Sequence, residues 1–385
     1  MRIAYISDNK MYLYSGGKVT ELLSERVAHY NETVRTINHN KEWKYSGTGA
    51  KFTGAVHEFN PDNNTNCRIN GLAWDGDGLV YSMVLGGMGG LYRKNPDKPE
   101  AAEEHILTSM GTDMGSISYK NKKLAVVMDG HIAVSDMNGS YDELTDGDSV
   151  ESCPSWSETE NKILCTTKGI ARSETGAASE FSPGGIIALN LSSNTIEELY
   201  SDEKSDCIAP QSDGEGNIFC VKQPYKVVQK KTPLWKDILL FPVRIIKAII
   251  GFLNAFSVIF GGEPLRDGKK RGDVKSKQKS DRDLYFEGRL IEAEKNEKEN
   301  AAKGEKNPGI FPLNRMLVKI SENGEETIIK RGVQDYILCS DGSVVVSNGR
   351  SIIHIGSNGE EVLAKAKLAH CLCEIPEVKD ESKCD

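Results

Sequence analysis

Hydrophobic and polar residues alternate along residues 343–365, which read SVVVSNG, RSIIHIGSNG and EEVLAK. Each short run of β-branched or aliphatic residues ends in a turn made of Asn and Gly. Alternation with a period of two, closed by such turns, is typical of antiparallel strands joined by hairpins. The pattern therefore predicts a β-meander.

The same succession of strands and turns recurs along most of the chain. Clear repeats occupy 69–109, 115–147, 150–203 and 206–224, and the last of these resumes at 314–332 before the stretch 333–365. A first repeat at 3–25 lacks its leading strand, while the run LAHCLCEI at 368–375 is one strand too many. If this last strand joins the sheet that begins at residue 3, the repeats close into a ring without an exposed edge, as a β-propeller requires.

Residues 26–66 decide the number of blades. The runs VRTINHN, EWKYSG and AVHEF read as weak strands, which would give seven blades, whereas a decorated loop would give six. We therefore predict an all-β fold, a six- or seven-bladed β-propeller closed by N- and C-terminal strands in one blade, with an α-helical and charged insertion in one blade. The predicted organisation is propeller 1–225, insertion 226–312, final blades 313–376 and polar tail 377–385.

Three pieces of the chain combine a leading strand with the turn that follows it. They read SWSETENKI at 155–163, APQSDGEGNIF at 209–219 and YILCSDGSVVV at 336–346. These repeats resemble those of bacterial TolB-like and WD-repeat-like propellers, although no repeat combines a Gly-His pair with a following Trp-Asp pair as WD repeats do. The resemblance implies a propeller fold and a role as an interaction platform, and it implies no reaction.

Composition narrows the class of partner and the compartment. The formal net charge of -8 argues against general nucleic-acid binding, because a phosphate polymer would be repelled. Residue 1 leads directly into a strand-like run, so we expect no signal peptide. Nine cysteines, several inside apolar strands, are typical of a reducing compartment. We expect a cytoplasmic protein, peripheral at the inner face of the membrane if it docks there.

The insertion begins with an unusually apolar segment, LWKDILLFPVRIIKAIIGFLNAFSVIFGG at 234–262. On a helix its polar and small residues form one narrow stripe, and bulky side chains cover the opposite side. Pro242 either kinks this helix or lies in its first turn. The predicted helix, about 234–260, would dock through Trp235, Phe241, Ile245, Ile249, Phe252, Phe256 and Ile259.

The helix is long enough to cross a bilayer, but the chain must return to complete the same blade and no second apolar segment brings it back. Basic residues follow it closely, and such residues beside an interfacial helix favour an anionic membrane surface. The predicted basic patch is Arg244, Lys247, Lys269, Lys270, Arg271, Lys275 and Lys277. Two other interpretations remain open: docking to the helices of a partner protein, and packing as part of a small accessory domain beside a solvated charged loop.

The position of the insertion suggests one working face. It lies between the second and third strands of its repeat, and the preceding repeat has a long loop, 168–185, at the equivalent place. In an earlier repeat, the Gly-rich turn at 85–90 occupies the same place between the second and third strands. Loops at equivalent places emerge on one face of a propeller. The remainder of the insertion, 287–309, reads as a polar helix or a disordered tether.

Motifs for chemistry are few. The chain contains no Gly-x-Ser-x-Gly elbow, P-loop, dinucleotide fingerprint or His-Glu-x-x-His helix. His370, Cys371 and Cys373 invite a metal interpretation, but one Cys-x-Cys lacks the second ligand pair of a structural zinc site, which favours packed thiols. Asp75 and Asp77 read first as a hairpin turn. We predict no catalytic residue, no metal and no cofactor.

The sequence therefore predicts a non-enzymatic, monomeric β-propeller scaffold that docks to a membrane surface or a membrane-associated partner through 234–282. One alternative is a metal-dependent hydrolase or lyase of the lactonase type, with acidic residues around the ring axis and the insertion as a lid. Another is a sensor propeller that binds a small molecule or a peptide.

Overall fold

The computed structural model describes residues 1–44, 67–172, 178–225, 283–286 and 289–377. The chain divides into two compact units, one made of Met1–Tyr225 with Lys295–Asp385 and the other of Lys226–Glu294. Each unit is described by itself.

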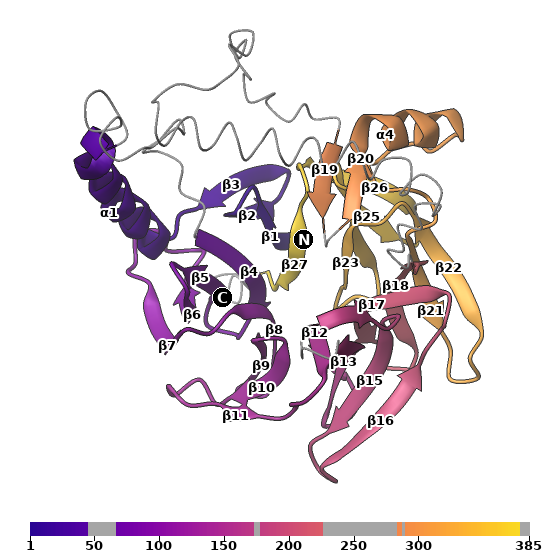
Figure 1. The fold of residues 1–385 in the computed structure, drawn as a ribbon. Coiled ribbons are helices and arrows are strands. Elements are labelled where there is room, and N and C mark those ends of the chain that lie inside the picture. The colour runs from indigo at the N-terminus through magenta and orange to yellow at the C-terminus, as the bar shows by residue number, and fades with distance from the viewer. Residues whose placement is uncertain (45–66, 173–177, 226–282, 287–288, 378–385) are drawn as a thin grey trace, which may run out of the picture. The chain divides into compact units, whose positions relative to one another are not determined.

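The larger unit is a six-bladed β-propeller, in which antiparallel sheets follow one another around an axis (Figure 1). Blade 1 consists of β27 (His370–Ile375), β1 (Arg2–Ser7), β2 (Lys10–Ser15) and β3 (Lys18–Leu22). Blade 2 consists of β4 (Cys67–Trp74), β5 (Leu79–Leu85), β6 (Met88–Lys94) and β7 (Glu104–Met110). Blade 3 consists of β8 (Met114–Lys120), β9 (Lys123–Met128), β10 (His131–Ser135) and β11 (Asp142–Glu143).

The remaining three blades follow the same order, with the first-named strand nearest the axis. Blade 4 consists of β12 (Ser149–Trp156), β13 (Lys162–Arg172), β15 (Gly185–Asn190) and β16 (Thr195–Tyr200), and β14 (Ala178–Phe181) pairs with β13. Blade 5 consists of β17 (Ser205–Ser212), β18 (Ile218–Pro224), β21 (Met316–Ile320) and β22 (Glu326–Arg331). Blade 6 consists of β23 (Asp335–Leu338), β24 (Val344–Ser347), β25 (Ser351–Gly356) and β26 (Gly359–Lys365).

The predicted ring closure is confirmed. The C-terminal strand β27 pairs antiparallel with β1, so that Arg2 lies opposite Ile375 and Ala4 opposite Cys373. Both ends of the chain thus contribute to blade 1, and the sheet that begins at the N-terminus receives its innermost strand from the C-terminus.

Of the two predicted blade counts, six is confirmed. Residues 34–40, read as a weak strand, lie in the helix α1 (Glu25–Lys41), which the short 3₁₀ helix η1 (Glu42–Lys44) follows. Ser24 caps α1 by accepting a hydrogen bond from the backbone N–H of Val27. Val27, Tyr30 and Val34 recur at the three- and four-residue spacing of one helix face. The weak strand pattern of 55–59 lies outside the described residues.

In the smaller unit, β19 (Asp283–Phe286) and β20 (Arg289–Glu292) form an antiparallel hairpin. The helix α4 (Ala293–Ala302) begins at its end and continues into the larger unit. The expected polar stretch 287–309 is therefore a strand first and a helix afterwards. The predicted apolar helix at 234–260 lies outside the described residues.

Hydrophobic residues fill every junction between neighbouring blades. One cluster joins blades 1 and 2 around Ile6 and Tyr81, and another joins blades 6 and 1 around Ile3 and Val345. Four further clusters occupy the junctions of blades 2 and 3, 3 and 4, 4 and 5, and 5 and 6. The core is therefore a ring of interfaces rather than a single centre.

Polar contacts link the same blades close to the axis. At each of the six junctions, an innermost strand or the turn that follows it exchanges a hydrogen bond with its neighbour. The bonds run from Asn70 Nδ2 to Met114 O (2.6 Å), Trp156 N to Ser118 Oγ (3.2 Å), Glu158 N to Ser212 Oγ (3.3 Å), Leu338 N to Gln211 Oε1 (2.9 Å), Leu372 N to Asp335 Oδ2 (3.4 Å) and Cys371 Sγ to Asn70 O (3.2 Å).

The closing blade offers a direct test of the ring core. Ile6 is fully buried between blades 1 and 2, so we expect Ile6→Ala to lower the free energy of unfolding by about 2–5 kcal/mol. The matched control is Ile196→Ala on the outer strand β16, where the side chain is 63% exposed and the expected change is within about 0.5 kcal/mol. Urea unfolding followed by tryptophan fluorescence measures both variants, and equal losses would contradict the proposed importance of this junction.

Candidate functional site: the long-loop face

The two faces of the propeller carry connections of very different length. Because strands alternate in direction, the connections after the first and third strands of each blade emerge on one face, and those after the second and fourth strands emerge on the other. We call the first face the short-turn face, because every connection within a blade that emerges there is nine residues long or shorter. These connections are 16–17, 75–78, 95–103, 121–122, 136–141, 157–161, 191–194, 213–217, 321–325, 339–343 and 357–358. The excursions 23–66, 173–184 and 225–315 begin and end on the second face, the long-loop face.

The base of the hairpin β13–β14 is fixed by a buried ion pair. Asp206, at the start of β17, is fully buried and accepts the backbone N–H of Gly184 at 2.9 Å. Lys168 Nζ lies 3.2 Å from Asp206 Oδ1. A carboxylate without solvent needs such partners, because a buried unpaired charge is strongly unfavourable. The pair therefore joins the hairpin of blade 4 to the inner strand of blade 5.

A second buried carboxylate stands at the junction of blades 3 and 4. Glu151 is 2% exposed, and its Oε2 accepts a hydrogen bond from Thr145 Oγ1 at 2.9 Å and lies 3.0 Å from His131 Nδ1. Its Oε1 accepts a bond from Thr167 Oγ1 at 3.1 Å. Both oxygens are thus used to hold elements of two blades together on the long-loop face.

The insertion leaves and re-enters blade 5 at firmly held points. Tyr225, at its start, donates a hydrogen bond from its hydroxyl to the carbonyl oxygen of Phe181 in β14. Arg315, at its end, is 4% exposed and donates to Gln223 Oε1 at 2.8 Å and to the carbonyl oxygen of Val333 at 2.8 Å. The guanidinium therefore ties the returning chain both to β18 and to the start of blade 6.

The returning segment is packed against blade 6. Asn300 of α4 donates from Nδ2 to the carbonyl oxygens of Gly309 and Phe311 at 2.8 and 2.9 Å. Arg350, in the turn between β24 and β25, pairs with Glu297 of α4 at 3.0 Å. This part of the insertion belongs to the rigid framework of the propeller.

The helix α1 is held at its first half. Its Tyr30 packs against the core of blades 1 and 2, and a Cβ placed on Gly86, in the turn between β5 and β6, would lie 2.8 Å from the Tyr30 hydroxyl oxygen. Towards the other end, Ile37 is 44% exposed and Trp43 61% exposed. The helix thus presents apolar side chains to solvent at the rim of the propeller.

Acidic and thiol groups face one another around the inner strands. Burial raises the pKa of Asp335, although the backbone N–H of Tyr336 donates to its carboxylate and His370 opposes the shift electrostatically. Burial also raises the pKa of Cys371 well above that of a free thiol, and the carboxylate of Asp335 adds to this shift. Neutral thiols are poor nucleophiles and poor metal ligands, so Cys371 acts as a packing group here.

Among the described residues, no group of three or more His, Cys, Asp or Glu side chains has a geometry suited to a metal ion. Cys373 lies in the core between blades 1 and 2, and Cys371 packs against that core, in agreement with the packed-thiol interpretation. Asp75 holds a hairpin turn, as expected, by accepting backbone N–H groups of Asp77 and Gly78.

The structure confirms that the predicted long loop lies between the second and third strands of blade 4, but its first residues, 168–172, belong to β13 and Gly185 belongs to β15. The predicted docking residues of the apolar helix and of the basic patch all lie between 235 and 277, outside the described residues. No described helix is both long and apolar enough to span a bilayer.

Sequence reasoning missed the buried acids at the starts of inner strands. Glu151 is the third residue of β12, Asp206 the second of β17 and Asp335 the first of β23, in three consecutive blades. The available signal was an acidic residue near the start of an otherwise apolar or small-residue leading strand, in three successive repeats.

Comparison with known proteins gives structural likeness alone. No family model matches the sequence, and no curated protein matches it. Among solved structures, the chain is similar to TolB from Acinetobacter baumannii, with 10% identity, a TM-score of 0.49 and coverage of 97% of this chain and 66% of that one. It is also similar to the tricorn protease, with 13% identity, a TM-score of 0.41 and coverage of 96% of this chain and 33% of that one. A gluconolactonase from Xanthomonas campestris is similar with 10% identity, a TM-score of 0.40 and coverage of 79% of this chain and 77% of that one.

The chain thus spans less than two thirds of the TolB protein and one third of the tricorn protease. The predicted resemblance to TolB-like propellers holds at the level of the fold. The neighbours include both hydrolytic enzymes and TolB, so the likeness does not select a function.

An ion-pair network joins blade 4 to blade 5 beside the insertion. Lys222 Nζ lies 2.9 Å from Asp202 Oδ2 and 2.8 Å from Glu326 Oε1, and its side chain is 13% exposed. Burial alone would lower the pKa of Lys222, but hydrogen bonds with Glu326, Tyr200 and Asp202 outweigh it and raise this pKa. The pKa of Asp202 is lowered, first by the backbone N–H of Lys204 and then by Lys222. Burial on its own would raise the pKa of Glu326, but the hydrogen bonds from Lys222 and Tyr200 outweigh burial, and this pKa is lowered.

We expect Lys222→Met to lower the free energy of unfolding at neutral pH by about 1–3 kcal/mol, because it leaves two carboxylates facing one another. Acids with lowered pKa values stabilise the fold above their ordinary range and lose this contribution as pH falls through the folded-state value. The difference between parent and variant should therefore shrink below roughly pH 4. Urea unfolding from pH 7 to pH 3 measures it, with exposed Lys123→Met as the control, and a difference independent of pH would contradict the assignment.

Proposed function

We propose that this protein is a non-enzymatic propeller scaffold that docks at an anionic membrane surface through residues 234–282. The observation that carries the proposal is the asymmetry of the two faces: the connections within blades are short on the short-turn face, whereas the three long excursions all begin and end on the other face. Extra chain length that is confined to one face is typical of a binding surface on a rigid scaffold.

The chemistry of the inserted segment fits a membrane surface. Its predicted apolar helix, with Phe252 and Phe256 among the bulky side chains opposite the polar stripe, would enter the interface between headgroups and acyl chains. Basic residues such as Lys269, Lys270 and Arg271 would contribute about 1 kcal/mol each near an anionic leaflet. The remainder of the protein is acidic, so the attraction depends on this local patch.

The framework around the insertion supports a docked orientation. Both ends of the excursion are tied to the propeller, by Tyr225 at the start and by Arg315 at the end. A membrane-bound segment with two fixed ends would restrict the tilt of the propeller more than a single flexible tether does. The short-turn face would then stay available for a soluble partner.

The first experiment is co-sedimentation with liposomes made of anionic or neutral lipid. The full chain is compared with a version in which 230–282 is replaced by a Gly/Ser linker. This replacement keeps β19, β20 and α4, and so retains the contacts of Asn300 and Glu297. We expect binding of the full chain to anionic vesicles, weakened by salt, and loss of binding in the replacement.

A double substitution on the apolar side of the predicted helix removes two aromatic side chains and adds two negative charges, while every residue of the basic patch stays in place. Phe252→Asp with Phe256→Asp should abolish sedimentation with anionic vesicles, while thermal unfolding of the propeller stays as in the parent. Sedimentation of the double variant equal to that of the parent contradicts the docking mechanism. Failure of the full chain to bind any vesicle overturns the membrane assignment and transfers the segment to a protein partner.

The hydrolase alternative has its own test. A metal-dependent enzyme of the lactonase type would retain a divalent metal close to one per chain when purified without chelator. Under the scaffold proposal, we expect a substoichiometric metal content, and unchanged thermal stability after treatment with EDTA. Stoichiometric metal, measured by mass spectrometry and accompanied by a lower melting temperature after EDTA, would favour the enzyme.

A further inference from the structure

Three blades share an Asp-Gly turn between their first and second strands, on the short-turn face. In each turn the carboxylate oxygen Oδ1 accepts backbone N–H groups from residues further along, which holds the turn closed. The turns are Asp75-Gly76 in blade 2, Asp213-Gly214 in blade 5 and Asp341-Gly342 in blade 6.

In two of these blades the second carboxylate oxygen binds a cation from the same blade. Arg93 Nε lies 2.6 Å from Asp75 Oδ2 in blade 2. Lys319 Nζ lies 3.5 Å from Asp213 Oδ2 in blade 5. One oxygen therefore shapes the turn, and the other is the site of an ion pair.

The cation comes from the same register position in both blades. In each blade the cationic side chain belongs to the residue of the third strand that pairs with the second residue of the second strand. The pairs are Arg93 with Val80 and Lys319 with Phe219, and the same position in blade 6 pairs His354 with Val345.

Blade 6 therefore carries the shorter imidazole where the other two blades carry a long cationic side chain. Asp341 Oδ1 accepts the backbone N–H and the hydroxyl of Ser343 at 2.9 and 2.5 Å. Among the described residues, no hydrogen bond or ion pair reaches Asp341 Oδ2, and His354 Nε2 is buried without a hydrogen-bond partner. The two hydrogen bonds from Ser343, with a smaller electrostatic effect of His354, lower the pKa of Asp341, so this carboxylate is ionised at neutral pH.

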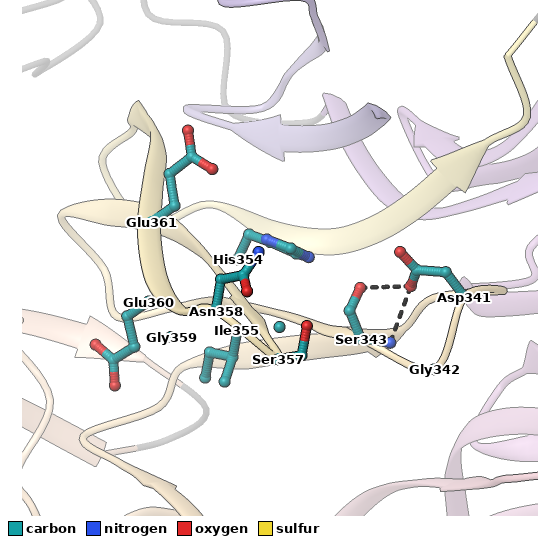
Figure 2. A pocket seen from close by; sticks show the side chains of 11 residues that line it. Asp341, Gly342, Ser343, His354, Ile355, Ser357, Asn358, Gly359, Glu360 and Glu361 are labelled. Carbon is teal, nitrogen blue, oxygen red and sulfur yellow. Dashed lines mark hydrogen bonds between the residues drawn. The ribbon is translucent and has the colours of Figure 1, made fainter.

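A pocket of about 490 Å³ occupies the corresponding corner of blade 6 (Figure 2). Figure 2 shows Asp341 and Ser343 at one side and the turn with Ser357 and Asn358 at the other, with His354 between them. Glu360 and Glu361 add negative charge to the lining. Lys330 neutralises Glu360 at 2.9 Å, which leaves the lining with a surplus of negative charge.

We propose that this pocket binds a guanidinium group, namely the side chain of an arginine on a partner protein. The bound cation takes the place beside Asp341 Oδ2 that Arg93 and Lys319 take beside the equivalent carboxylates. A planar guanidinium donates several hydrogen bonds in a fixed fork, so it can serve more than one acceptor of the lining at the same time. The site lies on the short-turn face and does not depend on the membrane proposal.

The test uses N-acetyl-arginine amide as the probe and its neutral isostere N-acetyl-citrulline amide as the control ligand. Binding is followed on the full chain by the methyl resonance of Ile355, which lines the pocket, with Ile132 in the core of blade 3 as the internal reference. We expect a saturable shift of Ile355 with the arginine probe, and binding of the citrulline probe weaker by about tenfold or more.

Two variants locate the site. His354→Arg should supply the cation from within the chain, as in blade 2, and abolish the shift of the pocket methyl group. Asp341→Asn keeps an oxygen for the turn and should also abolish binding, so the test stands even if one variant folds poorly. The matched control is Glu158→Gln, an exposed acid in a blade 4 turn on the same face, which should bind like the parent.

The outcomes separate the possible sources of the cation. Tighter binding of N-acetyl-arginine amide than of agmatine supports an arginine within a protein. Agmatine carries the same guanidinium together with a free amine. If agmatine binds more tightly, the pocket takes a small-molecule cation and the assignment to a partner protein is overturned. No saturable shift, equal binding of the citrulline probe, or unchanged binding in both pocket variants overturns the site itself.

Discussion

The closure of the ring is the constraint on which the rest of the structure depends. Each blade buries its apolar side chains only against its neighbours, so an open end would expose one whole interface. The pairing of β1 with β27 removes that end and leaves no inner strand without a partner. Around the axis, a hydrogen bond crosses every junction, from Asn70 through the inner strands and back to Asn70 by way of Cys371. These contacts fix the angle between blades more narrowly than apolar packing does, because hydrogen bonds are directional.

A closed ring frees the connections from any role in the core. Insertions after a second or fourth strand change neither the register of the sheet nor the packing between blades, and the loop-closure cost grows only slowly with length. Blade 5 shows the result: β18 and β21 stay paired from Lys222 opposite Met316 to Ile218 opposite Ile320, although the excursion between them is the longest of the chain. Buried charges such as Asp206 and Arg315 stand at the bases of these excursions, where chain segments from two blades converge and supply their ion-pair and hydrogen-bond partners.

The sequence was sufficient for the features that depend on periodicity. The alternation within strands, the Asn-Gly and Asp-Gly turns and the count of leading strands led to the propeller and to its closure by 368–375. The α1 region was misread because its apolar residues are few, and because Asn and Thr at 31–40 weaken both the helix and the strand pattern. The pairing of Asp206 with Lys168, or of Glu151 with His131, depends on which blades touch, and one sequence does not encode that relation in any local spacing.

Repetition within one chain makes departures from the repeat informative. Asp75 and Asp213 show what the Asp-Gly turn requires of its surroundings: backbone donors for one oxygen and a cation for the other. Blade 6 keeps the turn and its backbone donor but replaces the long cation by His354. In blade 6 the replacement costs the fold little, because Asp341 is exposed and an ion pair at an exposed position contributes about 0–1 kcal/mol. A change with little effect on stability that also opens a pocket beside an ionised carboxylate is more simply explained by recognition of a cation than by the needs of the fold.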